Sequence, residues 1–256
     1  MATKFVSNDV LIELLEQATE EEKLSLTKIL NESRKKPNSA KKIQCELSFA
    51  GGNSLMNLYR GEGTGYIDIV DDVLGKLEIT GFPSYLLEIR HCDEKDALQF
   101  DESTARKKGM EYLEKAEEQI ILKLLEKAYE NMSDQEKASF DEQMNKVAAS
   151  FDSSIATNLS GTAGLMVLGK MGGFATYTFL TTAMSTVTMG TLGFGAYTAA
   201  TSFLSILLGP VGWAGLGAFA LYSIGSENYK KTIPCVAIIG AIRQRIKYEN
   251  NIKKRL

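Results

Sequence analysis

The residues that could carry out nucleophilic or acid–base chemistry are few, and their spacing builds no catalytic set. His91 is the single histidine of the chain and stands beside Cys92. A serine or cysteine nucleophile needs a base within hydrogen-bond reach, and nothing in the sequence places such partners near His91. We therefore expect His91 and Cys92 to form a surface or packed pair, and we expect the protein not to be an enzyme.

Carboxylates close together in sequence are the second candidate for chemistry. Asp68 and Asp72 would share a face of a helix, with Asp71 beside them. Two carboxylates can contribute to a divalent-cation site, but the further oxygen ligands that such a site needs are not evident. The pattern favours a solvated acidic face, and we predict no metal site.

Other ligand-binding motifs are also missing. Cys45, Cys92 and Cys235 have no CxxC or Cys/His spacing, which argues against a zinc site and a disulfide framework. Gly61-Glu62-Gly63 and Gly193-Phe194-Gly195 are isolated GxG fragments and not nucleotide-binding fingerprints. Basic residues are not interleaved with aromatic ones as base stacking requires. We expect no cofactor and no nucleic-acid partner.

The elements that must position these residues are helices. Residues 1–36 predict a small helical hairpin, in which Thr19 and Glu22 form a capping box. Residues 37–158 predict a helical body with two sets of apolar residues at helical spacing. The first set is Tyr66, Ile69, Val70, Val73 and Leu74, and the second is Met110, Leu113, Ala116, Ile120, Leu124 and Ala128. No regular strand pattern occurs, so the fold class is all-α, a multi-helix bundle.

An uncharged segment near the C-terminus sets this chain apart. Met171–Ser226 contains 56 residues without Lys, Arg, Asp or Glu, in a chain that is 24% charged. Its length allows two crossings of a bilayer, since each needs about 20 apolar residues. Gly190–Gly193 and Gly209-Pro210 break it into two or three helices. Residues 159–227 therefore predict apolar, glycine-rich, membrane-type helices ending the bundle as a hairpin. The alternative is a buried hairpin wrapped by the helices of residues 103–150.

Several residues of this region suit contact with lipid. Gly169 and Gly173 make a small-xxx-small step, and Gly217 allows close helix packing or self-association. Lys170 can extend its ammonium group to an interface, and Trp213 suits the interfacial zone.

A basic tail follows the uncharged block. Residues 228–256 carry eight basic groups and one acid, a net charge of +7, so the rest of the chain must sum to −10. We expect Pro234 in the first turn of a last amphipathic helix, with Val236, Ile239, Ile242 and Ile246 on its apolar side. Anionic lipid is the predicted partner of the basic residues Lys230, Lys231, Arg243, Arg245 and Lys247. The alternative is a helix docked on the acidic N-terminal body.

One segment carries a family resemblance. Glu46 to Gly63 reads ELSFAGGNSLMNLYRGEG. It resembles the YaaW-like bacterial family, which is grouped with ubiquinol–cytochrome c chaperone-like proteins and is often preceded by a small helical domain of unknown function. The matching positions are Gly51, Gly52, Ser54, Asn57, Arg60, Gly61 and Gly63. The resemblance implies an all-helical fold and no known catalytic residues. We expect Arg60 to be a structural clamp on nearby helix-end carbonyls.

Together these patterns predict a non-enzymatic, membrane-associated protein at the cytoplasmic side of the inner membrane, bound peripherally or integrally. The apolar hairpin would be sheltered until triggered, as in a membrane-perturbing or pore-forming effector. The alternative is a soluble chaperone or assembly factor for a membrane or respiratory protein.

Overall fold

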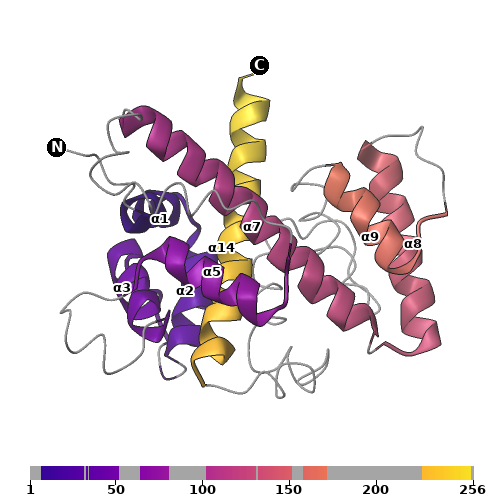
Figure 1. Cartoon of the computed structure of the whole chain (residues 1–256), viewed down its shortest axis with the longest axis horizontal. Helices are drawn as coiled ribbons and strands as arrows, with labels where there is room; N and C mark the ends of the chain where they lie inside the picture. Colours follow the sequence, from indigo (N-terminus) through magenta and orange to yellow (C-terminus); the bar gives the residue numbers. More distant parts are fainter. Residues whose placement is uncertain are drawn as a thin grey trace.

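A computed structural model describes residues 7–31, 33, 35–51, 64–80, 102–130, 132–151, 158–171 and 227–254. These residues form eight helices and no strand, so the predicted all-α class is confirmed (Figure 1). The helices are α1 (Ser7–Glu16), α2 (Glu20–Leu30), α3 (Ala40–Gly51), α5 (Tyr66–Lys76), α7 (Glu102–Glu130), α8 (Asp134–Phe151), α9 (Gly161–Lys170) and α14 (Glu227–Lys253).

Two long helices organise the molecule. α7 and α14 pack against each other, and α14 also packs against α1, α2, α3 and α5. Figure 1 shows these four shorter helices gathered on one side, with α8 and α9 at the far end of α7. The last described helix therefore lies at the centre of the fold and not at its edge.

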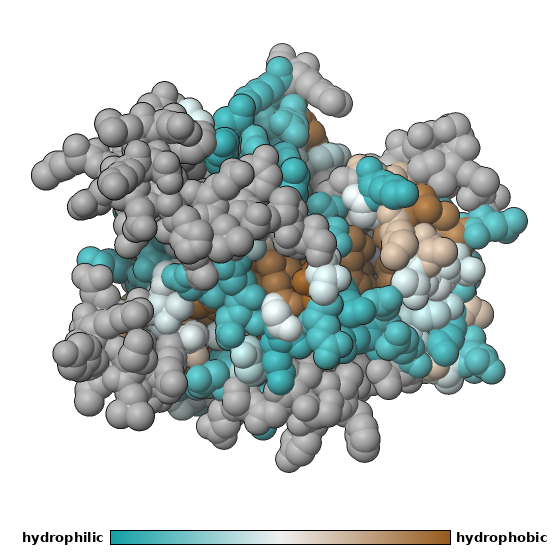
Figure 2. Space-filling model, in the orientation of Figure 1, coloured by the Kyte–Doolittle hydropathy of each residue, from teal (hydrophilic) through white to brown (hydrophobic). Residues whose placement is uncertain are grey.

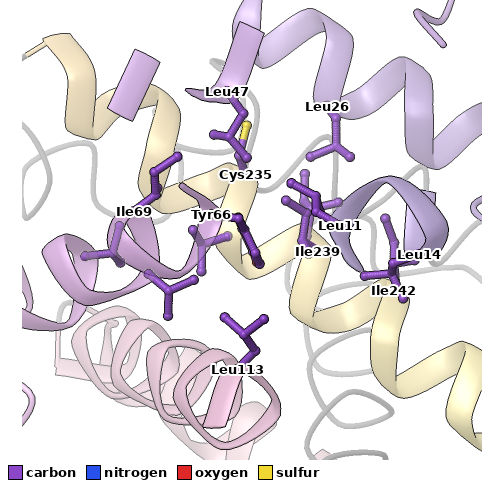
Figure 3. Close-up of a cluster of buried hydrophobic side chains, with 14 of the residues drawn as sticks. Leu11, Leu14, Leu26, Leu47, Tyr66, Ile69, Leu113, Cys235, Ile239 and Ile242 are labelled. Carbon is purple, nitrogen blue, oxygen red and sulfur yellow. The ribbon is translucent and has the colours of Figure 1, made fainter. Parts of the chain in front are cut away.

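The main core forms where α14 meets the N-terminal helices. The five apolar residues predicted on α5 are all buried there, and so are Leu113, Ala116 and Ile120 of α7. Figure 3 shows Tyr66, Leu113 and Ile239 close together, from α5, α7 and α14. Thr19 and Glu22 make the predicted capping box, with both reciprocal hydrogen bonds present. One member of the predicted α7 stripe departs from it, because Met110 is 40% exposed.

A second apolar cluster lies at the other end of α7. It joins Ile121 and Leu125 of α7 to Phe140 and Met144 of α8 and to Leu168 of α9. Ala237 and Ala241 of α14 also belong to this cluster. The molecule thus has two adjoining cores that share α7 and α14.

The start predicted for the last helix is wrong, and of its two predicted placements the structure shows the helix docked on the N-terminal body. Pro234 does not lie in the first turn, because α14 begins at Glu227, a full two turns earlier. The helix is also not a surface helix: every described side chain from Thr232 to Ile246 is buried. The predicted apolar residues are inside as expected, but Arg243 and Arg245 are inside with them, because α14 is surrounded by five other helices.

Several predicted features lie outside the described residues. They include the uncharged block beyond Met171, with Gly173, Trp213 and Gly217, and the pair His91 and Cys92. Gly52, Ser54, Asn57, Arg60, Gly61 and Gly63 are outside as well. Gly51 is described, and a Cβ there would lie 2.4 Å from Cγ1 of Ile69. Across the described ranges, no helix combines the length and apolarity needed to span a membrane.

Candidate functional site

A buried cluster of polar side chains lies between α5, α7 and α14. The Glu117 carboxylate accepts hydrogen bonds from Arg243, with Nε–Oε2 at 2.6 Å and an Nη–Oε1 distance of 2.9 Å. The hydroxyl of Tyr66 donates to the same Oε1 at 2.8 Å. All three side chains are buried, and Glu117 and Tyr66 have no exposed surface. This group is a charged triad within an apolar core.

Local sequence features place each member of the triad. Gly240 lets α14 approach α7, because a Cβ at that position would lie only 2.8 Å from Cβ of Glu117. Tyr66 begins α5, and its backbone N–H donates to Oδ1 of Asn8 at 2.9 Å. The next N–H, that of Ile67, donates to Oγ of Ser7 at 3.2 Å. The first turn of α1 therefore caps α5, a task that Gly65 has no side chain to perform.

Burial and charge act in opposite directions on Arg243. Burial alone would lower the pKa of its guanidinium, but the Glu117 carboxylate outweighs burial and raises that pKa above the usual value. The pKa of the Tyr66 hydroxyl is raised well above its usual value, first by burial and then by Glu117. The triad therefore consists of a cation, an anion and a neutral phenol, with each charge compensated.

Arg245 forms a second buried ion pair on α14. Its Nε and Nη donate to the two oxygens of Glu22, each at 2.8 Å. It also donates to Glu249 at 2.9 Å and to the backbone carbonyl of Gln17. Glu22 meanwhile accepts from the N–H of Thr19, so one carboxylate caps α2 and binds α14. The bidentate geometry suits arginine, whose planar group matches a carboxylate.

A more exposed layer of charge surrounds Glu118. Lys247 is half exposed and bonds Glu114 of α7. Glu118 lies one turn after Glu114, and its Oε1 is buried without a hydrogen-bond partner. Burial, and then the charge of Glu114, raise the pKa of Glu118 to about 7, although Lys247 opposes the shift. The surroundings of Glu118 thus disfavour its charged form.

The α8–α9 connection holds a second polar arrangement, which we name the α9 brace: Tyr129, Asp141, Asn145, Leu159 and Gly161. Asn145 donates to the carbonyl of Leu159 and accepts from its N–H, both at 2.8 Å. Asp141 accepts from the N–H of Gly161 at 3.0 Å and from the Tyr129 hydroxyl at 3.2 Å. The carboxylate therefore caps the N-terminus of α9, where negative charge is favourable and where Ser160 makes no side-chain cap.

The side chains of these arrangements join and cap helices, and none of them offers a reactive group. In the described part of the chain, no set of three metal-ligating side chains comes together. Asp71 and Asp72 accept hydrogen bonds from Tyr112 and Tyr229, so both are engaged in joining helices. The Cys235 thiol is fully buried, and burial raises its pKa, which disfavours the nucleophilic thiolate.

The residues predicted to contact lipid are found in three different environments. Lys170, Lys230 and Lys231 are exposed. Gly169 faces the protein, because a Cβ there would lie 2.7 Å from Cδ1 of Leu122. The predicted lipid contact is wrong for Arg243 and Arg245. Both are buried and paired, so the described structure gives them no surface on which to meet lipid.

Sequence reasoning missed the partners of these arginines. Glu117 was hidden inside a long helix with many acids, although it lies between the apolar positions Leu113, Ala116 and Ile120. A charged residue within an apolar stripe is the signal that could have found it. Tyr66 was predicted to be buried, but only as an apolar residue.

These features define an all-helical protein with a structural polar core. No protein-family profile matches the chain, and the comparison with solved structures found no match. The chain is 28% identical over 221 residues to a UPF0174 protein of Helicobacter pylori strain J99, covering 85% of this chain and 76% of the relative. A second UPF0174 protein of that strain is 26% identical over 235 residues, covering 90% of this chain and 99% of the relative.

A third relative is a UPF0174 protein of Helicobacter pylori strain 26695, 26% identical over 214 residues that cover 81% of this chain and 88% of the relative. The sequence is therefore similar to a bacterial family whose name states no activity. That similarity supports the bacterial, uncharacterised-family part of the resemblance, and the YaaW-like name stays a prediction.

Proposed function

We propose that this is a non-enzymatic, membrane-associated protein whose helical body holds the two ends of an uncharged, lipid-contacting block. The observation that carries the proposal is that the helices before and after the block are held on the same helix. α9 leads into it and α14 leads out of it, and both helices pack on α7. Their side chains also share the second apolar cluster, through Leu168, Ala237 and Ala241.

This arrangement constrains how the block meets a bilayer. Because both ends are held on one helix, a segment that enters the membrane must return to the same side. A stretch of 56 uncharged residues has the length for two crossings of about 20 residues each. We therefore favour a hairpin that inserts into, or lies within, one face of the membrane, with the body staying in the aqueous phase on the cytoplasmic side.

Exposed basic residues on the body support attraction to anionic lipid. Lys230 and Lys231 are exposed at the start of α14, and Lys170 is exposed at the end of α9. These lysines flank the block on both sides, where each basic residue near an anionic surface contributes roughly 1 kcal/mol. Arg243 and Arg245 do not take part, since their charge is neutralised in the core.

Carbonate extraction of membranes from cells producing the full-length chain tests this proposal. We expect the protein in the membrane pellet before extraction. Retention after extraction indicates an inserted hairpin, and release indicates a surface-bound one. A protein that stays in the supernatant in every condition, and does not float with vesicles containing anionic lipid, would show that the proposal is wrong.

A soluble chaperone or assembly factor is the second candidate. The burial of α14 favours it, because the expected basic surface helix is used instead to build the core. The YaaW-like resemblance also suggests a chaperone-like function. Recovery of one defined membrane or respiratory client, with no membrane-bound fraction, would favour this candidate.

A further inference from the structure

The C-terminal turns of α14 extend beyond the helices that enclose the rest of it. Arg245 and Lys247 make the last ion pairs between α14 and other described helices. Beyond them, every residue from Asn250 to Lys254 is exposed. Figure 1 shows these turns standing clear of α1, α2 and α3. We name residues 247–254 the α14 tip, which is a helix end that the body leaves uncovered.

The α14 tip is basic and carries one exposed apolar side chain. Lys253 and Lys254 are exposed, and within the described residues neither forms an ion pair. The single acid of the tip, Glu249, is engaged by Arg245 of the same helix. Ile252 is 42% exposed beside these charges. Figure 2 shows hydrophilic residues gathered at this end of the molecule. The tip therefore offers positive charge with an apolar contact, which is complementary to an acidic protein surface.

An acidic surface lies beside the base of the tip, at the turn between α1 and α2. Three exposed acids make this surface, which we name the acidic corner: Glu16, Glu20 and Glu21. Glu20 bonds Lys23 of its own helix and still leaves 74% of its side chain exposed. Arg245 donates to the carbonyl of Gln17 at 3.3 Å, and this bond holds the corner against α14. One end of the molecule thus carries both charges side by side.

The tip does not neutralise the acidic corner of its own chain. Lys253 follows Arg245 by eight residues of unbroken helix, which place it about 12 Å further along the axis. At physiological salt the Debye length is about 8 Å, so attraction over that distance is largely screened. The corner of a second copy can approach the tip directly. Rotation by half a turn about an axis between tip and corner pairs each tip with the other copy's corner, so both contacts form together.

We propose that the chain forms an isologous homodimer in which the α14 tip of each copy binds the acidic corner of the other. The two exposed lysines at the end of the tip pair with the corner carboxylates, and Ile252 supplies the apolar contact. Arg243 and Arg245 stay in the core of their own chain. Because the contact is mainly between surface charges, the dimer is weak and its affinity falls as salt is added. This dimer goes beyond the proposed function and does not depend on lipid.

Reversing the charge of each half tests the dimer by sedimentation of the purified full-length chain in density-matched detergent micelles. For wild type, we expect the dimer dissociation constant to rise about tenfold between about 50 and 500 mM salt. Lys253→Glu with Lys254→Glu makes tip and corner both negative, and Glu16→Lys with Glu20→Lys makes both positive. Each double variant should self-associate about tenfold more weakly than wild type.

Mixing the two double variants in equal amounts is the decisive measurement. Every tip then meets a corner of opposite charge, so a heterodimer should form with an affinity within about threefold of wild type. Lys28→Glu with Lys41→Glu is the matched control, because both lysines are exposed and lie at the other end of α2 and at the start of α3. This control changes the net charge as much as the tip variant does and should leave the affinity unchanged.

The outcomes decide the proposal in either direction. A wild-type chain that stays monomeric at low salt overturns it, and so does a mixture that associates no better than its components. Association that ignores both salt and charge reversal also overturns it, because the contact would then lie elsewhere. Should a double variant fail to fold, Lys253→Glu and Glu16→Lys are mixed in the same way. Vesicle flotation is measured separately, so the dimer can fail while membrane association stands, and the reverse.

Discussion

At the scale of single residues, the stability of the core depends on the Glu117–Arg243 pair. Glu117→Gln leaves the Arg243 charge buried without a counter-charge, and we expect it to lower the free energy of unfolding by about 3–5 kcal/mol. The double variant Glu117→Met with Arg243→Met removes both charges and should recover most of that loss. Urea unfolding of the single and double variants measures both effects. Additive losses in the double variant would contradict the assigned pairing.

Glu118 gives a prediction about pH. The pKa of Glu118 is raised to about 7, above its ordinary value of 4.5, so the folded state binds the proton more tightly than the unfolded state. Its contribution to stability is therefore full below about pH 4.5 and is lost as pH rises through 7.

Glu118→Gln mimics the protonated form at every pH. We expect this variant to be more stable than wild type by about 1–2 kcal/mol at pH 8, a figure reduced for partial solvent access, and equal to it near pH 4.5. Glu114→Gln is a useful comparison, because it removes the neighbouring charge while keeping Glu118. A difference between wild type and Glu118→Gln that does not change with pH would rule out this environment for Glu118.

At the scale of elements, the end of α5 shows a conformation that its sequence does not favour. The N–H of Ile79 bonds the carbonyl of Leu74, and the N–H of Glu78 bonds that of Gly75. This is a Schellman ending, and Glu78 occupies its left-handed position with φ of 57°. We expect Glu78→Gly to raise the free energy of unfolding by about 1 kcal/mol, because glycine adopts this conformation without strain. Thermal unfolding measures the change, and a destabilised variant would contradict it.

The contact between α7 and α14 depends on a missing side chain. Gly240→Ala places a methyl group 2.8 Å from Cβ of Glu117, and both are attached to backbone that cannot easily shift. We expect a loss of about 1–3 kcal/mol, as in other overpacked cores. Gly75→Ala is the matched control, since nothing lies within 4 Å of its added methyl group, and it should be neutral or slightly stabilising. Equal effects of the two substitutions would show that α14 does not approach α7 this closely.

How much the sequence predicts also depends on the element. Periodicity located α5 and its five buried residues, because each faces the core at helical spacing. It failed for α14, where Cys235 to Ile246 are buried on every side and no polar face exists to give a period. The charge of Arg243 and Arg245 then looked like a solvent-facing stripe. Their partners Glu117 and Glu22 lie more than a hundred residues away, and local spacing carries no information on such pairs.

At the scale of the whole molecule, the two anchored ends predict a topology. When the protein is bound to vesicles, residues on α9 and residues on α14 should stay outside the bilayer and on the same side, because both helices pack on α7. The middle of the uncharged block should become protected. Ala163 and Asn250 are exposed and provide reporters on α9 and α14, and Thr201 lies near the centre of the block.

Single cysteines at these three positions test the topology with a membrane-impermeant thiol reagent. Cys45 and Cys92 are replaced by serine, while Cys235 can remain because it is buried and its thiol pKa is raised. With vesicles added, we expect Ala163→Cys and Asn250→Cys to label as fast as in solution, and Thr201→Cys to label at least tenfold more slowly. Protection of one end alone would mean that the block crosses an odd number of times, which is incompatible with both ends being held on α7.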